Sequence, residues 1–296
     1  MTTSSTLIAS SRPPFLLLTP AVLSLSFAIS YWQQGSINMV LTILILIAAL
    51  SAHISVNAFD EYADFVSGLD LNTIRTPFSG GSGALPADPS SLHKVKLLAW
   101  FTLTITSSIG LYFIYIRGWT LLPLGLTGLV IIISYTNVLT KNAWLCLIAP
   151  GFAFGPLFII GSDIVLTGGY SISAAAASVP VFFLTNNLLL LNQFPDVDAD
   201  RNAGREHFLI KYSKHSASQL FSLFNILAFT SLIVAIYWSL LPVWALLGVL
   251  PASIALTASA ELLTRPNQDQ ILLSTMSKNV AVNLLTPILI AIGVML

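Results

Sequence analysis

The sequence predicts an all-α integral membrane protein with nine transmembrane helices enclosing a central cavity. Only 8% of its 296 residues are charged and 55% are hydrophobic, whereas soluble domains contain about 25% charged residues. The apolar residues form runs that match the roughly 20 residues needed to cross a bilayer as a helix. The basic residues are also concentrated on one side of the proposed membrane, as expected of a polytopic membrane protein.

Nine apolar runs are separated by polar residues or by Pro and Gly breaks. They cover residues 14–33, 39–59, 95–115, 119–138, 143–162, 173–192, 217–237, 240–262 and 279–296. These runs leave no room for a separate soluble domain, so we expect one transmembrane domain over residues 1–296. The first twelve residues lack a cleavage-like small-residue site, and a removable signal peptide is therefore not expected.

Lys and Arg accumulate on the cytoplasmic side of membrane proteins. With nine helices, eleven of the twelve basic residues fall at the N-terminus or in even-numbered connections, and only Arg117 falls on the other side. The N-terminus is therefore predicted to lie in the cytoplasm. The net charge is zero and there is no long basic run, so no nucleic-acid partner is expected.

Nine of the twelve acidic residues fall in two segments on the same predicted face. Carboxylates at membrane depth cost at least about 2.5 kcal/mol each, so they seldom persist without a partner or a task. In a continuing helix, a spacing of four places Asp60 with Asp64, and Asp196 with Asp200, on one face. The segments contain Asp60, Glu61, Asp64, Asp70 and Asp88 after the second span, and Asp196, Asp198, Asp200 and Glu206 after the sixth.

Two such pairs of carboxylates can converge, and they then repel one another unless a cation lies between them. Hard oxygen ligands suit Mg²⁺, which commonly completes its coordination with substrate phosphates. Basic residues on the same face, among them Arg205 and Lys214, could hold such a phosphate group. The sequence therefore predicts a magnesium diphosphate site at the cytoplasmic face.

The second acidic segment carries a specific resemblance. Residues 192–205 read Asn-Gln-Phe-Pro-Asp-Val-Asp-Ala-Asp-Arg-Asn-Ala-Gly-Arg, which resembles the Asn-Asn-x-Arg-Asp-x-x-x-Asp-Arg-x-Ala-Gly-Lys run of the UbiA superfamily of intramembrane prenyltransferases. Pro195 stands where that family often has Arg. The likeness extends over most of the chain, since the family places its two aspartate-rich motifs after the second and sixth of nine helices.

Residues 60–70, Asp-Glu-Tyr-Ala-Asp-Phe-Val-Ser-Gly-Leu-Asp, resemble the Asn-Asp-x-x-Asp-x-x-Ser-Gly-x-Asp motif of the branch that prenylates 1,4-dihydroxy-2-naphthoate. Asp60 stands where Asn is usual and Glu61 where Asp is usual. These departures keep oxygen ligands but change the expected metal geometry and acceptor fit.

The resemblance implies a Mg²⁺-dependent prenyltransferase that moves a polyprenyl group from an isoprenyl diphosphate to an aromatic acceptor in quinone biosynthesis. The acceptor it implies is 1,4-dihydroxy-2-naphthoate, in the menaquinone pathway, and the location a bacterial plasma membrane with the site facing the cytoplasm. The implied catalytic and metal-binding residues are Asp60, Asp64, Asp196 and Asp200, with Glu61 and Asn192 as supporting metal ligands. The implied diphosphate-binding residues are Arg75, Lys141, Arg201 and Lys211.

Two other functions remain open from the motifs alone. A terpene cyclase would use the same ionisation step but capture the cation within the same prenyl chain. A transporter would use the acids to bind transported ions, and Gly/Pro interruptions at matching depths in two halves would support it.

Two further features allow more than one interpretation. The Gly/Ser-rich residues 76–83 predict either a flexible turn or a mobile cap whose backbone amides bind anions. His53, within the second span, is expected to be a hydrogen-bonded core residue rather than a ligand.

Overall fold

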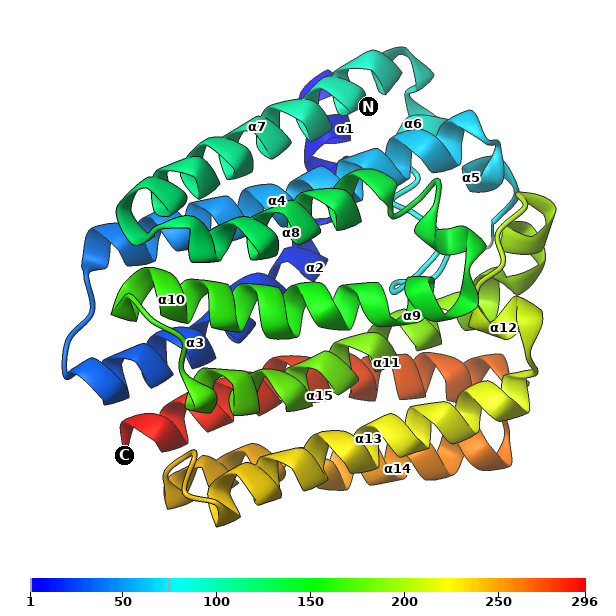
Figure 1. Ribbon diagram of the computed structural model, residues 1–296. Coiled ribbons are helices and arrows are strands. Elements are labelled where there is room, and N and C mark those ends of the chain that lie inside the picture. The colour runs from blue at the N-terminus through cyan, green and yellow to red at the C-terminus, as the bar shows by residue number, and fades with distance from the viewer. Residues whose placement is uncertain (1, 74) are drawn as a thin grey trace.

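The chain is built from helices, and the longest of them lie side by side (Figure 1). The computed structural model describes residues 2–73 and 75–296. Within this part, eight segments are long and apolar enough to cross a membrane. The remaining predicted span corresponds to a shorter apolar segment, Trp119–Ser134. The predicted all-α membrane fold is confirmed, with one of its nine helices shorter than expected.

The N-terminal half supplies four of these spans. The first comprises α2 and α3, the second is α4, the third is η1 with α7, and the short fourth is η2 with α8. The element bounds are α1 (Thr3–Ser10), α2 (Pro13–Leu16), α3 (Leu18–Gln34), α4 (Met39–Val66), α5 (Leu69–Asn72), α6 (Ala84–Ala87), η1 (Pro89–Ser91), α7 (Leu92–Arg117), η2 (Trp119–Leu121) and α8 (Leu122–Ser134).

The C-terminal half supplies the other five spans. The long α11 is central among them and packs against α9, α13 and α15. The element bounds are η3 (Leu139–Lys141), α9 (Ala143–Phe152), η4 (Ala153–Ile160), α10 (Gly161–Thr167), α11 (Ile172–Asn202), α12 (Phe208–Lys211), α13 (Lys214–Tyr237), η5 (Val243–Val249), α14 (Ala252–Thr264) and α15 (Asp269–Met295).

Helices α4 and α11 extend beyond the apolar runs that predicted them, and both acidic motifs lie on their extensions. The predicted spans ended at residues 59 and 192, whereas the helices continue to Val66 and Asn202. Each helix is followed within two residues by a glycine with positive φ, Gly68 at 78° and Gly204 at 77°. Glycine adopts this left-handed conformation without a Cβ penalty and commonly ends helices. The helices therefore stop at their glycines and not where the apolar residues end.

The fifth span contains a π-helical turn, η4, between α9 and α10. Pro156 lies within it and has no N–H to donate, which disrupts the regular helical hydrogen bonds. Two glycines allow this span to approach α11: a Cβ on Gly155 would lie 2.7 Å from the Ser178 carbonyl, and one on Gly151 would clash with the Phe182 carbonyl and with Asn186. Small residues permit such close backbone approach between transmembrane helices.

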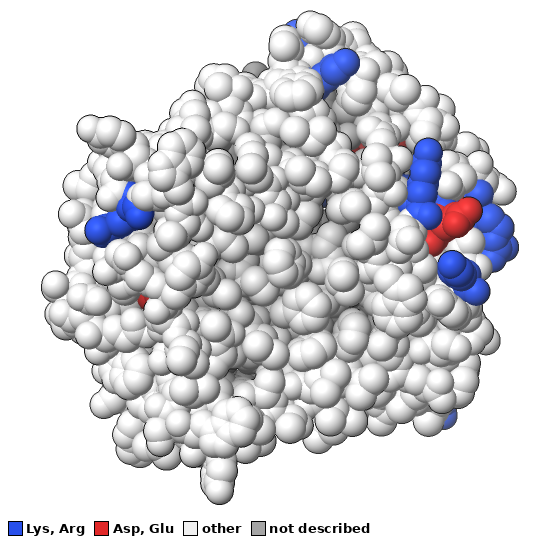
Figure 2. Space-filling view, in the orientation of Figure 1, with Lys and Arg blue, Asp and Glu red and all other residues white. Residues whose placement is uncertain are grey.

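Charged side chains gather at one end of the helices, over α5 and α12, in the view of Figure 2. The sides of the bundle in that view are nearly free of charge. Such a surface suits lipid, in which unpaired charges are costly. The charged end is where the extensions of α4 and α11 lie.

Candidate active site

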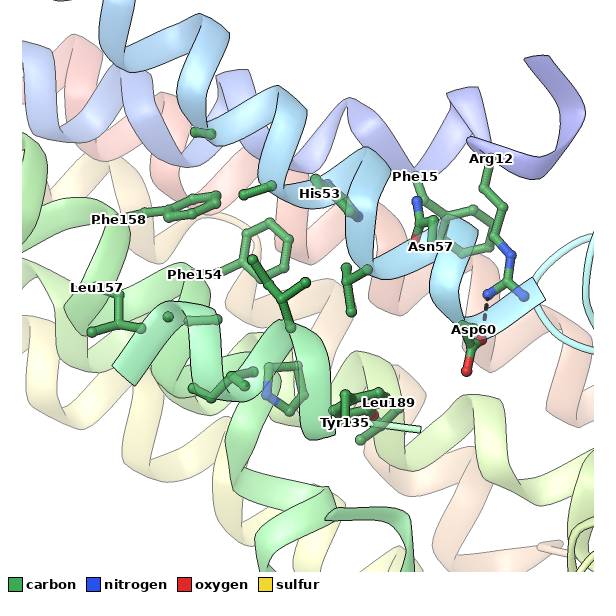
Figure 3. Close-up of a pocket in the computed structure, with 18 of the residues that line it drawn as sticks. Arg12, Phe15, His53, Asn57, Asp60, Tyr135, Phe154, Leu157, Phe158 and Leu189 are labelled. Carbon is green, nitrogen blue, oxygen red and sulfur yellow. Dashed lines mark ion pairs between the residues drawn. The ribbon is translucent and has the colours of Figure 1, made fainter. Parts of the chain in front are cut away.

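A cavity of about 820 Å³ lies between the helices. One end is lined by Asp60 on α4 and by Asp196 on α11, and the other by apolar residues such as Leu121 and Val165. Along α4 its lining runs from Asp60 to Ile45, about 22 Å at 1.5 Å per residue. Figure 3 shows the polar end beside Arg12 and Asp60 and the apolar end beside Leu157 and Phe158. The cavity is therefore a long apolar channel with a charged end.

The first motif places two aspartates on the cavity and turns its glutamate away from it. Asp60 and Asp64 both line the cavity. Glu61 is fully buried, and its carboxylate accepts hydrogen bonds from Arg12 Nε at 2.8 Å, from the Ser82 amide at 2.7 Å and from the Ser82 hydroxyl at 2.7 Å. Glu61 is rotated by about 100° from Asp60 on the helix, and its carboxylate, engaged by Arg12 and Ser82, does not line the cavity.

The second motif presents three side chains at intervals of one helical turn. Asn192, Asp196 and Asp200, spaced by four on α11, all line the cavity. The Thr73 hydroxyl donates to Asp196 Oδ1 at 2.7 Å. Asp198, by contrast, is exposed and pairs at 3.7 Å with the exposed Arg201. The four-residue spacing therefore distinguishes the cavity-facing acids from the solvent-facing one.

Arg205 joins the two motifs. Its Nη2 contacts Asp64 Oδ1 directly and lies 3.7 Å from Asp60 Oδ1, while its Nη1 lies 2.9 Å from Asp200 Oδ1. Burial alone would lower the pKa of Arg205, but the carboxylates of Asp64, Asp60 and Asp200 raise it above its ordinary value. The guanidinium therefore stays charged. His207 contacts the other oxygen of the Asp200 carboxylate, with Nε2 lying 2.9 Å from Asp200 Oδ2.

Arg12 reaches the first motif from the N-terminal segment. Its Nη1 lies 3.2 Å from Asp60 Oδ2 and its Nη2 lies 2.8 Å from Glu61 Oε1. Burial by itself would lower the pKa of Arg12, but Glu61 and Asp60 raise it. The residue has a left-handed backbone, with φ of 52°, just before Pro13. Arg12 and Arg205 thus approach Asp60 from different segments of the chain.

The Gly/Ser-rich segment closes over this end. Residues 76–82 line the cavity, and Ser82 holds the segment to Glu61. Asp70 is 1% exposed, and neither of its carboxylate oxygens has a hydrogen-bond partner among the described residues. Gly81, with φ of 71°, packs so closely that a Cβ there would lie 2.5 Å from Asp70 Oδ1. Burial, and then the nearby charge of Glu61, raise the pKa of Asp70 to about 7.

The donor set can be tested against a divalent cation. No group of three or more His, Cys, Asp or Glu side chains is gathered closely enough to hold a metal ion within residues 2–73 and 75–296. Nevertheless four aspartates and one asparagine face the same end of the cavity. The guanidinium groups of Arg12 and Arg205 pair with three of these aspartates. Asp196 pairs with no cation in the described part of the chain. This excess of hard oxygen ligands fits Mg²⁺.

Comparison with known proteins decides the family. The sequence profile of the UbiA prenyltransferase family matches residues 18–280. The chain belongs to the UbiA prenyltransferase family. The resemblance seen in the two acidic motifs is thereby confirmed.

Individual proteins of the UbiA family resemble this chain at low sequence identity. The chain is 25% identical over 193 residues to 1,4-dihydroxy-2-naphthoate octaprenyltransferase of Bacillus subtilis (strain 168), covering 64% of this chain and 60% of that protein. A UbiA homologue from Aeropyrum pernix K1 has a TM-score of 0.67 at 17% identity, covering 92% of this chain and 96% of that one. A UbiA homologue from Archaeoglobus fulgidus bound to DMAPP and Mg²⁺ has a TM-score of 0.63 at 12% identity, covering 98% and 99%. These two structures share the fold.

The residues expected from the UbiA resemblance divide into two groups in the structure. The cavity brings together Asp60, Asp64, Asn192, Asp196 and Asp200. The others are not among the residues that line it: Glu61, Arg75, Lys141, Arg201 and Lys211. The last four of these are exposed, although Arg75 Nη2 also donates to the Asp70 carbonyl at 2.6 Å.

Sequence reasoning missed the two arginines nearest the acids. The sequence predicts Arg205 only as one of several basic residues on the acidic face, and it assigns Arg12 no role in the site. The position of Arg205 at the end of the second motif, where the family pattern has Lys, was a usable signal. Arg12 had no comparable signal, because its 49-residue separation from Glu61 is closed only by the tertiary fold.

Proposed function

We propose that this UbiA-family chain is a Mg²⁺-dependent prenyltransferase, which transfers a polyprenyl group from an isoprenyl diphosphate to an aromatic acceptor. The observation that carries the proposal is an elongated cavity, acidic at one end and lined mainly by apolar residues over the roughly 22 Å of α4 between Asp60 and Ile45. An isoprenyl diphosphate has a matching division, with a charged head and a long apolar tail. The Archaeoglobus fulgidus homologue binds DMAPP and Mg²⁺, which supports the same ligand class here.

The aspartates Asp60, Asp64, Asp196 and Asp200, with Asn192, would hold the metal. Bound Mg²⁺ supplies a Lewis acid that stabilises negative charge on the departing diphosphate. Arg12 and Arg205 limit repulsion among the carboxylates and present positive charge at the same end of the cavity. Arg75, Lys141, Arg201 and Lys211, which are exposed at this end, would attract the diphosphate before it enters.

In the transfer, the allylic C–O bond breaks and its electron pair leaves with the diphosphate. A ring carbon of the acceptor then forms the new C–C bond, and the same carbon loses its hydrogen as a proton, or its carboxylate as CO₂, so that the ring regains aromaticity. The apolar wall excludes water, which would otherwise capture the allylic cation. The segment at residues 76–82 completes this exclusion at the charged end, since it lines the cavity there.

The acceptor class follows from relatedness. The Bacillus subtilis relative is a 1,4-dihydroxy-2-naphthoate octaprenyltransferase, so we propose this acceptor and a role in menaquinone biosynthesis. A bacterial plasma membrane is the corresponding location. The basic residues at the charged end support a cytoplasmic location for that end and for the N-terminus, by the positive-inside rule.

The test is turnover by the purified full chain with Mg²⁺ and geranylgeranyl diphosphate. 1,4-Dihydroxy-2-naphthoate, a hydroxybenzoate and homogentisate serve as alternative acceptors. We expect a prenylated naphthoquinone precursor and Mg²⁺-dependent release of diphosphate. A cyclic hydrocarbon formed without any acceptor would instead identify a terpene cyclase, and the absence of both products and of diphosphate release would refute prenyl chemistry.

Matched aspartate variants separate the site from the surface. Asp196→Asn should abolish turnover, because Asp196 faces the cavity and pairs with no other cation among the described residues. Asp88→Asn should keep it, because Asp88 lies outside the cavity lining and accepts hydrogen bonds from Thr6, Ser90 and Ser91. Wild-type turnover by Asp196→Asn at low Mg²⁺ would show that the second motif is not the metal site.

A further inference from the structure

His53 lies in the apolar part of the cavity, seven residues before Asp60 on α4, about 10 Å along the helix axis. It is 7% exposed. Its Nδ1 lies 2.9 Å from the Thr19 hydroxyl oxygen, which satisfies the sequence expectation of a hydrogen-bonded core residue. Its Nε2 makes no hydrogen bond to the residues that the structure describes, and His53 lines the cavity. One ring nitrogen is thus held by the protein and the other is left for an occupant of the cavity.

The surroundings of His53 are aromatic. Its ring packs edge-on to Phe154, with centroids 5.0 Å apart and planes at 77°. Phe154 packs similarly on Phe158, at 5.1 Å and 63°. Figure 3 shows His53 and Phe154 between the charged end, where Phe15 lies near Arg12, and the apolar end, where Phe158 lies. A flat aromatic molecule can stack on or pack edge-on to such rings.

The hydroxyl groups of Thr106 and Ser107, which also line the cavity, are already hydrogen-bonded within the protein. The Thr106 hydroxyl donates to the Ala48 carbonyl at 3.0 Å, and the Ser107 hydroxyl to the Leu103 carbonyl at 2.8 Å. His53 differs because its free nitrogen is held in place by Thr19 from the opposite side of the ring. In binding pockets that are mostly apolar, a few placed polar groups of this kind fix a ligand's orientation.

An isoprenyl tail has no atom that can donate a hydrogen bond to this nitrogen or accept one from it, so a tail alone leaves the nitrogen without a partner. A ring hydroxyl can pair with the nitrogen in either tautomer, because it both donates and accepts. A diphosphate head held at Asp60 would leave its tail to extend past His53, about 10 Å away along α4. The free nitrogen therefore faces the part of the cavity that an acceptor ring would share with the tail.

We infer that His53 Nε2 hydrogen-bonds a hydroxyl group of the aromatic acceptor, whose ring packs against Phe154. This inference rests on the proposed prenyl transfer. It assigns His53 as a catalytic-site residue that selects hydroxylated acceptors and orients them, and it assigns Thr19 as the positioning residue that fixes the imidazole.

The test compares His53→Leu and His53→Phe with the wild type, using 1,4-dihydroxy-2-naphthoate and geranylgeranyl diphosphate. Both variants should raise the KM for the acceptor about fivefold, equivalent to about 1 kcal/mol, and leave the KM for the diphosphate unchanged. His53→Phe keeps a planar ring, so it decides the question if the leucine variant fails to fold. The control His93→Gln alters an exposed histidine and should change neither KM.

Two analogues that each lack one hydroxyl, 1-hydroxy-2-naphthoate and 4-hydroxy-2-naphthoate, sharpen the test as competitive inhibitors. The analogue that lacks the hydroxyl bound by His53 should bind the wild type more weakly than the dihydroxy compound does. The His53→Phe variant should bind this analogue and the dihydroxy compound equally well. Equal discrimination by wild type and variant, or an unchanged acceptor KM, would overturn the inference while leaving the prenyltransferase proposal intact. A wild-type chain without prenyl transfer would overturn the proposed function, and the inference with it.

Discussion

Arg205 and Asp64 are in direct contact although 141 residues separate them in the chain. The same guanidinium lies against Asp60 and Asp200, so one cation neutralises carboxylates from both acidic motifs. Its side chain is 17% exposed, and it is therefore only weakly screened by water. This contact joins the ends of α4 and α11 at the charged end of the cavity.

Arg205→Gln should destabilise the protein, because breaking a buried pair leaves uncompensated charge at a cost of about 3–5 kcal/mol. Added Mg²⁺ should restore more thermal stability to this variant than it adds to the wild type, since the metal replaces the missing positive charge. Thermal unfolding in detergent across a Mg²⁺ series measures this. Arg201→Gln, which alters an exposed pair, should unfold like the wild type. An equal effect of Mg²⁺ on the stability of Arg205→Gln and of the wild type would contradict a metal site at these carboxylates.

Asp70 predicts a pH dependence of stability. Its pKa is raised to about 7 in the folded protein by burial and then by Glu61, from an ordinary value of about 3.9. The folded state therefore holds this proton more tightly than the unfolded state, and stability falls as pH rises from about 4 to 7. Asp70→Asn removes the charge, so it should be more stable than the wild type at pH 8, with the difference vanishing towards pH 4. A difference that is the same at both pH values would exclude this cause.

Gly81 and Gly68 offer a matched pair of glycines with positive φ, 71° and 78°. Gly81→Ala would push a Cβ to 2.5 Å from Asp70 Oδ1, whereas Gly68→Ala meets nothing within 4 Å. The Gly68 variant should be destabilised only by the cost of a left-handed backbone at alanine, about 1–2 kcal/mol. The Gly81 variant should be destabilised more and should also turn over more slowly, because the segment that covers the charged end must move. Denaturation and rate measurements on both variants check this, and equal losses would mean that the segment adapts freely.

The orientation in the membrane can be tested with single cysteines. Asn202 and Gly168 are both exposed. Asn202 is the last residue of α11, and Gly168 lies just before the other end of this helix. Asn202→Cys should react with an impermeant thiol reagent from the cytoplasm, and Gly168→Cys only from the other side. The native Cys146 is buried and serves as the background. Labelling of both positions from one side would disprove the predicted topology.

Local sequence patterns determined the fold class and the cavity-facing acids. Apolar runs of bilayer length predict transmembrane helices because lipid requires every backbone polar group to be paired within the segment. The four-residue spacing of Asp60 with Asp64, and of Asp196 with Asp200, places each pair on one face because a helix turns every 3.6 residues. Helix geometry alone does not exclude Glu61, which is three residues from Asp64; its contacts with Arg12 and Ser82 come from the tertiary fold.

Only the tertiary structure decided which cations meet these acids and what the cavity presents to a substrate. Arg12 and Arg205 reach the motifs across separations of 49 and 141 residues, whereas the predicted Lys141, Arg201 and Lys211 remain exposed. The free nitrogen of His53 is defined by Thr19, 34 residues away. Sequence periodicity specifies the face of a single helix, but contacts between helices depend on how several such faces pack together, which no local pattern encodes.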